Sequence, residues 1–568
     1  MAGLGGTLWR RSQQVHLSAF SAISARDPLP SRREIDPPAR IIAVARLASI
    51  PADTFDVAII GGGIIGCGIA RDAAMRGLRV VLFERGDFGG GTTAASTRIV
   101  HGGLRYLEML DFRLVRLDLR ERETLLRIAP HLVQPLEFLV PFVAGAPVSQ
   151  LKIRVGLTLY DALSFDKSLP SHRFLPAAET RAMERALRTT DVGGAAAYYD
   201  ARVDLPERLA LENALDAEIH GATLVSYCGV SSAAVSGGAV RGVHVRDALD
   251  GDDATINARV VVNATGAWWE QVAAAQTGQM PGRIRTTKGI HIVCPPLTDH
   301  ALVLFSQVDR RLMFAIPRAG HTWIGTTDTD YDGDPAEARA TRADVEYLLS
   351  SVRGLFPSLS VNDVLYTTAG VRALVTRGGR ASSVSRMHRV ARDLPLRGMI
   401  SVLGGKITGY RAIAEEVTDA VCESVGIKRP CTTAVTPLPG ARGDSTRAAS
   451  SGVAGPPAFL SAVYGSRAGE VLALARSAAD LDRPVSPRYP DIAAQVVYGV
   501  RFEHCVRVSD FIRRRTMLGA SADQGWDAAP RVAALMGAEL GWSPARIAAE
   551  LDTFRRDIDS TRAFRDER

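Results

Sequence analysis

The stretch Phe55–Gly68, FDVAIIGGGIIGCG, decides the fold of this chain. Its apolar half predicts a buried parallel strand, and its glycines at 61, 63 and 66 form a G-x-G-x-x-G turn before a helix over residues 69–76. A second apolar strand, residues 79–83, ends at Glu84, 18 residues after Gly66. Such glycines let a pyrophosphate approach a helix N-terminus, and the acid can accept hydrogen bonds from ribose hydroxyls. The unit predicts a dinucleotide site without choosing between FAD and NAD.

The bulk composition is that of a globular enzyme with two or three domains. The 568 residues are 46% hydrophobic and 23% charged, and no apolar run reaches the roughly 18–20 residues of a membrane span. A net charge of +7, without basic clusters interleaved with aromatics, argues against a nucleic-acid partner. The six cysteines are scattered, so neither disulfides nor a metal site is expected.

The N-terminal segment, residues 1–53, is rich in arginine and poor in acids, as organellar targeting peptides are. Four prolines between positions 28 and 38 would interrupt a long amphipathic helix. A disordered extension, or a start codon placed too far upstream, is therefore favoured over targeting. Whether the mature protein contains this segment stays open.

Two later junctions return the chain to the dinucleotide. Strand 259–263 runs into Ala264-Thr265-Gly266, and strand 399–403 runs into Gly404-Gly405-Lys406 ahead of another helix. Short strands over 284–330 predict an antiparallel sheet lying over the cofactor. The expected α/β fold has a doubly wound, Rossmann-like dinucleotide domain of discontinuous segments, an antiparallel cap domain and a C-terminal helical domain.

Seven motifs, in order, carry a family resemblance. They are IGGGIIGCGIARD at 60–72, HGGLRYLE at 101–108, NATG at 263–266, KGIH at 288–291, IGTTD at 324–328, GVR at 370–372 and GGKITGYRAIA at 404–414. The chain resembles the FAD-dependent, respiratory glycerol-3-phosphate dehydrogenases, strongly over about 54–430. Three departures concern the substrate region: Ala373 and Gly409 replace more usual residues, and Arg318 stands where a tryptophan is common.

The resemblance implies FAD, oxidation of sn-glycerol 3-phosphate to dihydroxyacetone phosphate, and electron transfer to a membrane quinone. With the composition of the chain, it gives an extension (1–53), an oxidoreductase region (54–435), a linker (436–457) and a C-terminal α-helical domain (458–568). Within the second, the FAD core covers about 54–105, 200–283 and 395–435, and the substrate cap about 106–199 and 284–394. We expect a cytoplasmic protein that binds peripherally to the inner face of a bacterial membrane. A homodimer is possible, and a mitochondrial location is less favoured.

The resemblance also assigns the site. The catalytic residues would be His101, Arg105, Arg372 and Lys406. The substrate would contact Arg105, Tyr106, Arg372, Arg386, Lys406 and Thr408. FAD would contact Gly61, Gly62, Gly63, Gly66, Glu84, Ser96, Thr97, Gly103, Leu104, Thr265, Gly266, Gly404, Gly405 and Lys406.

The chemistry suits these residue types. Arginine binds a phosphate dianion through its bidentate fork, and a histidine titrating near neutrality can take the hydroxyl proton. His101 is the first candidate base, although it could instead hydrogen-bond the flavin or its own turn; His291 is the second. Because the flavin carries the redox chemistry, no metal is expected.

Other functions remain open. Oxygen could replace quinone as the acceptor, which would make an oxidase, or the substrate could be another 2-hydroxy or 2-amino acid. A flavin-bound regulatory protein without turnover is disfavoured because Arg105, Arg372 and Lys406 are all present. The arginines between 501 and 515 predict a solvated helical face, or less favourably a surface for acidic lipids.

Overall fold

The computed structural model describes residues 47–51, 53–143, 148–188, 191–375, 387–443 and 457–567. Its first sheet is centred on β1 (Phe55–Ile60), which pairs in parallel with β2 (Val80–Phe83) and β10 (Asp253–Asn263). The strand order is β17-β18-β10-β1-β2-β7, and the hairpin β8–β9 joins it through β10. The remaining strands are β7 (Thr223–Val225), β8 (Cys228–Ser236), β9 (Ala239–Asp247), β17 (Arg389–Arg392) and β18 (Met399–Leu403). The predicted strands 259–263 and 399–403 thus lie side by side, parallel to β1.

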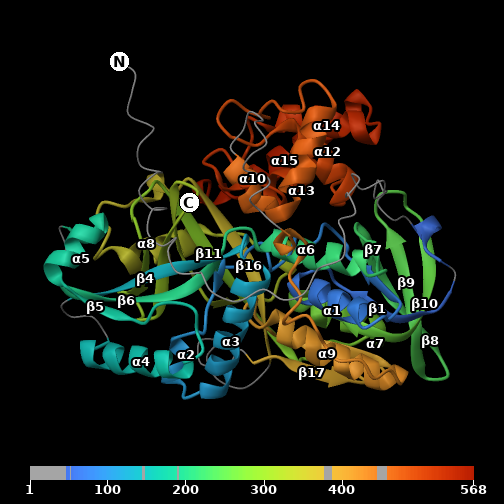
Figure 1. Ribbon diagram of the computed structural model, residues 1–568, viewed down its shortest axis with the longest axis horizontal. Coiled ribbons are helices and arrows are strands. Elements are labelled where there is room, and N and C mark those ends of the chain that lie inside the picture. Colours follow the sequence, from blue (N-terminus) through green and yellow to red (C-terminus); the bar gives the residue numbers. More distant parts are fainter. Residues whose placement is uncertain are drawn as a thin grey trace, which may run out of the picture. The chain divides into compact units, whose positions relative to one another are not determined.

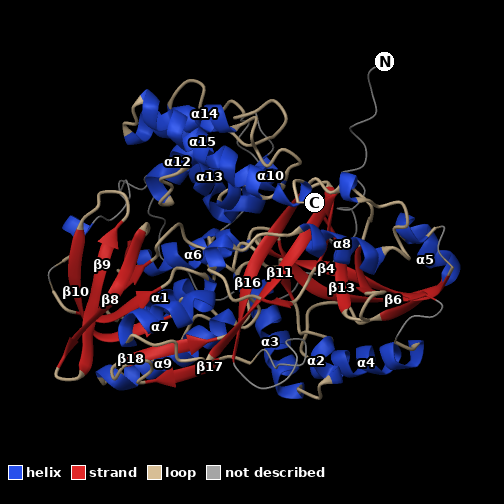
Figure 2. Cartoon of the chain, turned by 180° about the vertical axis from the view of Figure 1, so that it is seen from behind, coloured by secondary structure: helices blue, strands red, loops and turns tan. Residues whose placement is uncertain are grey.

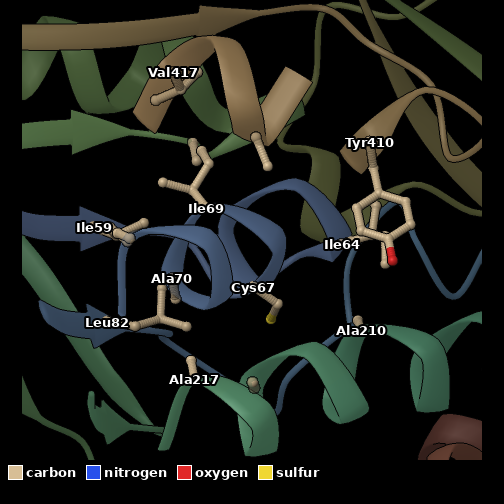
Figure 3. Close-up of a cluster of buried hydrophobic side chains, with 14 of the residues drawn as sticks. Ile59, Ile64, Cys67, Ile69, Ala70, Leu82, Ala210, Ala217, Tyr410 and Val417 are labelled. Carbon is tan, nitrogen blue, oxygen red and sulfur yellow. The ribbon is translucent and has the colours of Figure 1, made fainter. Parts of the chain in front are cut away.

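Helix α1 (Ile64–Met75) packs between α6 (Pro206–Ile219) and α9 (Tyr410–Val425), as Figure 3 shows. It begins at Ile64, five residues before the predicted start at residue 69. Gly66 and Gly68 therefore lie inside the helix and not in the turn before it. A Cβ on Gly68 would lie 2.9 Å from the ring of Tyr410. Glycine there serves close helix packing, which outweighs its low helix propensity.

The second sheet has the order β15-β11-β14-β13-β12-β4-β6-β3, with β16 on β11 and β5 on β6. Its strands are β3 (Ile99–Val100), β4 (Val133–Val143), β5 (Arg173–Pro176), β6 (Val192–Val203), β11 (Ile284–Cys294), β12 (Ala301–Phe305), β13 (Leu312–Arg318), β14 (His321–Gly325), β15 (Thr329–Asp330) and β16 (Tyr366–Val375). Every pair that joins these strands is antiparallel except β4–β12, which is parallel. The predicted antiparallel cap is therefore a mixed sheet, because chain segments far apart in sequence meet at that pair. Strand β3, from the segment assigned to the FAD core, belongs to this second sheet.

Helices flank both sheets (Figures 1 and 2). Beside the second sheet these are α2 (Arg105–Glu108), α3 (Phe112–Ile128), α4 (Gln150–Leu163), α5 (Ala177–Met183) and α8 (Arg342–Val352); α7 (Trp269–Thr277) packs on β8. The 3-10 turns are η1 (Leu47–Ser49), η2 (Arg185–Leu187), η3 (Gly266–Trp268), η4 (Pro335–Glu337), η5 (Val361–Asp363), η7 (Pro439–Ala441), η9 (Gly465–Arg467), η10 (Leu518–Ala520) and η11 (Ala563–Arg565). None of the helices in the described ranges combines the length and hydrophobicity that a membrane span requires.

The C-terminal region is helical, as predicted. It consists of α10 (Pro457–Tyr464), α11 (Ala468–Ser477), α12 (Ala493–Phe502), α13 (Val508–Arg514), α14 (Ala529–Leu540) and α15 (Pro544–Ser560). Most of the predicted linker, residues 444–456, lies outside the described residues, as does the N-terminal segment up to residue 46.

The predicted solvated arginine face is wrong for Arg514 and Arg515, whereas Arg501 and Arg507 keep about a third of their side chains exposed. Arg515 is fully buried and the Arg514 side chain is 13% exposed, and both bind Asp87, which follows β2 of the first sheet. Neither side chain is available to lipid, since a guanidinium buried with a carboxylate has exchanged its water for that partner. These ion pairs join the C-terminal helices to the dinucleotide-binding region.

Candidate active site

One cavity of about 1150 Å³ lies where the two sheets and the C-terminal helices meet. Its wall includes Gly61 and Gly63 from the turn after β1, Arg372 from β16, and Arg514 from α13. Of the predicted site residues, the following line it: Gly61, Gly63, Glu84, Ser96, Thr97, His101, Gly103, Leu104, Tyr106, Thr265, Gly266, Arg372, Gly404, Gly405, Lys406 and Thr408. Residues that span more than 300 positions of the sequence therefore share one site.

The glycines at the junction of β1 and α1 have different structural roles. Gly61 has φ +102°, and a Cβ there would lie 2.9 Å from the carbonyl oxygen of Ala264, whereas a Cβ on Gly66 would lie 1.8 Å from the carbonyl oxygen of Gly61. Both glycines therefore allow two backbone segments to pack closely against each other. A Cβ on Gly63 would meet only the Thr93 hydroxyl, at 3.6 Å, so this position faces the cavity.

Glu84 is held at the edge of the cavity by backbone donors. Its two oxygens accept from the N–H of Gly62 at 2.7 Å and from the N–H of Gly86 at 2.8 Å. Burial raises the pKa of Glu84, while these hydrogen bonds oppose that shift. Gly62 and Gly66 do not line the cavity; Gly62 contributes by orienting this carboxylate.

Lys406 has a carboxylate partner that the sequence did not indicate. Its Nζ lies 2.6 Å from Oδ2 of Asp118 in α3 and 3.8 Å from the centre of the Tyr106 ring. Asp118 is buried, and burial raises its pKa to about 6 even though Lys406 opposes the shift. The lysine charge is therefore shared among Asp118, the Tyr106 ring and the cavity.

Arg372 is seated against β11 and the loop after β14. Its Nη1 donates to the carbonyl of Thr327 at 3.1 Å and lies 3.3 Å from Oδ1 of Asp328, and its Nη2 donates to the Thr326 hydroxyl at 2.8 Å. A Cβ at Gly289 would lie 2.1 Å from the guanidinium, so the glycine of the KGIH motif makes the room for this arginine. The guanidinium remains about one fifth exposed, toward the cavity.

The two candidate bases differ sharply. The ring of His101 reaches the cavity edge-on to Phe314, and its backbone N–H donates to Oγ1 of Thr408 at 3.2 Å. His291 is buried and bonded through Nε2 to Thr97, 3.1 Å away. Burial, with Arg372 and Arg98 nearby, lowers the pKa of His291 to about 3, so it is neutral at physiological pH.

Two predicted arginines are not located at the level of the side chain. Arg386 lies outside the described residues, and for Arg105 only the backbone, at the start of α2, is described. The site as described therefore contains two of the four predicted cations, Arg372 and Lys406.

Residues that sequence reasoning missed hold the site together. Asp87 is three residues after Glu84 and lines the cavity beside Arg514. Asp118 is an acid within an apolar helical periodicity, which is the signal that could have marked it. The donor to each carboxylate was predictable only from the tertiary fold, since Lys406 and Asp118 are 288 residues apart.

The glycine turn, the acid after β2 and the cavity between two sheets define a dinucleotide-binding site, and the comparisons with known proteins identify the class as FAD-dependent oxidoreductases. Residues 56–411 match the family described as FAD dependent oxidoreductase, and residues 431–547 match the C-terminal domain of alpha-glycerophosphate oxidase. The chain is 38% identical to a glycerol-3-phosphate dehydrogenase of Synechocystis sp., over 86% of this chain and 93% of that protein. It is 34% identical to glycerol-3-phosphate dehydrogenase 2 of Mycobacterium tuberculosis, over 93% and 91%.

A solved structure is similar over nearly the whole chain. The glycerol-3-phosphate dehydrogenase from Bacillus halodurans, complexed with FAD, matches with a TM-score of 0.71 and 29% identity, covering 90% of this chain and 95% of that one. The chain belongs to the FAD-dependent glycerol-3-phosphate dehydrogenase family. The resemblance, the fold class and the FAD cofactor predicted from the sequence are confirmed.

The described residues fit FAD. The N-cap residue of α1, Gly63, has no side chain to cap the helix, and the backbone N–H of Ile64 donates to Oγ1 of Thr93 at 3.1 Å. Because Gly63 has no side chain, the space in front of it belongs to the cavity. The Glu84 carboxylate lies just after the end of β2. These are the groups that a pyrophosphate and a ribose require.

Proposed function

We propose that this enzyme oxidises sn-glycerol 3-phosphate to dihydroxyacetone phosphate and passes the electrons to a membrane quinone. The observation that carries the proposal is the meeting of Arg372 and Lys406 with the glycine turn in one cavity. A substrate with a phosphate and a secondary alcohol needs cations at one end and an electron acceptor at the other. The relatives named above supply the substrate class.

The protein residues would bind, orient and deprotonate. Arg372, with Arg105 and Arg386 as further candidates, would bind the phosphate, and Lys406 would complete the positive field. His101 would accept the proton of the C2 hydroxyl at a ring nitrogen, since His291 is buried and bonded elsewhere. FAD, when bound, supplies the acceptor for the hydride from C2.

The central experiment removes Arg372 from FAD-loaded protein. Arg372→Ala should retain FAD and lower kcat/KM for glycerol 3-phosphate by about a hundredfold, as a lost charge-assisted contact worth roughly 3 kcal/mol implies. Lysine should rescue only in part, because an ammonium lacks the bidentate fork. Arg353→Ala, at an exposed arginine after α8, is the matched control.

Glycerol, which lacks the phosphate, separates two roles of Arg372. If the arginine binds phosphate, the variant loses its preference for glycerol 3-phosphate over glycerol. If it instead stabilises the oxygen that forms at C2, both substrates slow by a similar factor. Unchanged bleaching of the flavin absorbance on anaerobic mixing with glycerol 3-phosphate would remove Arg372 from the site.

A membrane surface for the quinone is supported by an apolar patch on helices α2, α3 and α4, which lie side by side in both views (Figures 1 and 2). Its exposed side chains are Met109, Leu110, Phe112, Leu151, Val155 and Phe165. Exposed Arg113, Lys152 and Arg154 accompany them. Apolar side chains among basic ones suit peripheral binding to an anionic leaflet, and α2 also borders the cavity through Tyr106. We place this contact at the inner face of a bacterial cell membrane.

Vesicle sedimentation tests the patch. Leu151→Ser with Val155→Ser should reduce binding to phosphatidylglycerol vesicles, while Val235→Ser, at an exposed valine of β8, should not. Equal binding by all variants would refute the assignment of this surface.

Oxygen is the second candidate acceptor, because the C-terminal match is to a domain of alpha-glycerophosphate oxidase. Steady-state turnover in air, with hydrogen peroxide and a soluble quinone analogue measured together, decides between them. Reduction of the quinone analogue without stoichiometric peroxide supports the dehydrogenase, and stoichiometric peroxide refutes it.

A further inference from the structure

Arg318 is a buried arginine whose hydrogen-bonding capacity is only partly used. It ends β13, is 7% exposed, and stacks over Trp323 with its Cζ 4.5 Å from the ring centre. Its Nη2 donates to the carbonyl of Asp204 at 2.7 Å and contacts Sδ of Met517 at 3.7 Å. Among the described residues, neither its Nε nor its Nη1 has a hydrogen-bond acceptor, although both atoms are buried.

Arg513, in α13 of the C-terminal helices, also lines the cavity. Its Nε and Nη2 are also buried without an acceptor in the described ranges, and its Cζ lies 5.6 Å from the centre of the Phe554 ring. Both arginines line the cavity and both act electrostatically on the phenol of Tyr366, whose hydroxyl donates to the carbonyl of Ala520 at 3.0 Å. Both guanidinium groups therefore lie within electrostatic range of Tyr366, Arg318 from the second sheet and Arg513 from the C-terminal helices.

Three carboxylates in this region are each engaged by another arginine. Glu207 is engaged by both terminal nitrogens of Arg98, and Asp87 is engaged by Arg514 and Arg515. Asp204 lies 3.8 Å from Nε of Arg318 but is shared with Arg202, 3.5 Å away. Asp557 also attracts Arg513 electrostatically.

The pKa values of both arginines are lowered. Burial lowers the pKa of Arg318 to about 10, and Arg98 adds repulsion. Burial likewise lowers the pKa of Arg513, with Arg514 adding to the effect. Desolvated cations with free donors are stabilised when an anion supplies both charge and acceptors.

We propose that Arg318 and Arg513 form a second oxyanion site, separate from the glycine turn and from Arg372 and Lys406, that binds a phosphate group. Buried guanidinium nitrogens left without acceptors match the several oxygens of a tetrahedral dianion. The ligand is either free phosphate or a phosphate monoester other than the substrate. The site joins the cap sheet to the C-terminal helices, so its occupancy would stabilise the contact between them.

The test is calorimetric titration of the FAD-loaded enzyme with inorganic phosphate and, separately, with glycerol 2-phosphate, at constant ionic strength set by chloride. Loaded protein is used so that the phosphates of FAD cannot account for the binding. Wild type and Arg372→Ala should bind at least one of the two probes. Arg318→Gln and Arg513→Gln should each raise its Kd by about tenfold or more, the effect of losing one charge-assisted contact.

Controls keep the result decisive. Arg241→Gln changes an exposed arginine of β9 and should bind the probes as wild type does. If Arg318→Gln fails to retain FAD, Arg513→Gln and Arg318→Lys carry the test. The proposal is overturned if neither probe binds the wild type, if Arg372→Ala alone abolishes binding, or if Arg318→Gln and Arg513→Gln bind unchanged. Which probe binds identifies free phosphate or a monoester as the source.

Discussion

The contact between the C-terminal helices and the dinucleotide-binding region should depend on Asp87. Its carboxylate lies 2.8 Å from both Nη1 and Nη2 of Arg515 and also accepts from Nε of Arg514. Asp510 provides the second negative charge of this cluster, 2.5 Å from Nη2 of Arg514. The Asp87 and Arg515 side chains are fully buried. We expect Asp87→Asn to weaken the fold and to loosen FAD, because Asp87 borders the cavity near Glu84.

The expected loss in the free energy of unfolding follows from the burial of the Asp87–Arg515 ion pair. Removing one partner of a buried ion pair leaves an uncompensated charge and costs about 3–5 kcal/mol. Asparagine keeps one acceptor oxygen, so we expect the lower end, about 3 kcal/mol. Although burial opposes it, Arg515 and Arg514 hold the pKa of Asp87 below its ordinary value. The stabilisation is therefore present above the unfolded pKa of about 4 and lost as pH falls through the lower folded value.

The assay is urea unfolding of FAD-loaded protein at pH 7.5, followed by far-ultraviolet circular dichroism and by flavin fluorescence. The matched control is Asp559→Asn, which removes an exposed pair whose Oδ1 lies 3.3 Å from Nε of Arg555. That change should cost less than about 0.5 kcal/mol. If Asp87→Asn cost no more than the control, the ion pairs would not hold the two regions together.

Other outcomes can be checked on the same preparation. Gly66→Ala should yield no FAD-loaded folded protein, because its Cβ would lie 1.8 Å from a backbone oxygen, whereas Gly63→Ala should fold and only weaken FAD retention, measured by ultrafiltration; equal behaviour would refute the division of roles in the turn. Asp118, whose pKa is about 6, should become protonated as the pH falls from 7.5 to 5.5. The protonated side chain no longer attracts Lys406, so the lysine becomes available to the substrate. The KM for glycerol 3-phosphate should therefore fall more between pH 7.5 and 5.5 in wild type than in Asp118→Asn. The substrate phosphate titrates equally in both enzymes, so identical pH profiles would exclude this role for Asp118.

The dinucleotide unit was predictable because its signals are local. The apolar run 55–60, the glycine spacing and the acid at 84 each act within a few turns of chain, and the structure places them in one strand–turn–helix–strand unit. The later strands at 259–263 and 399–403 were also predictable, since each is apolar and ends in small residues. The reason for Gly61 was not: its neighbour is the backbone of Ala264, more than 200 residues later.

Long-range partners were beyond the sequence pattern. An arginine-rich helix has the same composition whether it faces solvent or a buried aspartate, so Arg514 and Arg515 gave no sign of Asp87. The parallel β4–β12 pair was missed for the same reason, because strand pairing depends on which edges meet and not on the periodicity of either strand.

By itself, the sequence determined the family, the FAD-binding turn and the order of the motifs that line the cavity, because backbone conformation and strand burial follow from short-range sterics and hydrophobicity. Only the tertiary structure decided how the charges are used. Lys406 is shared with Asp118, Arg372 is seated by Gly289, His291 is neutral, and Arg318 keeps buried donors. The physical reason is that the energy of a charge depends on its solvation and its neighbours, which residues far apart in the chain supply.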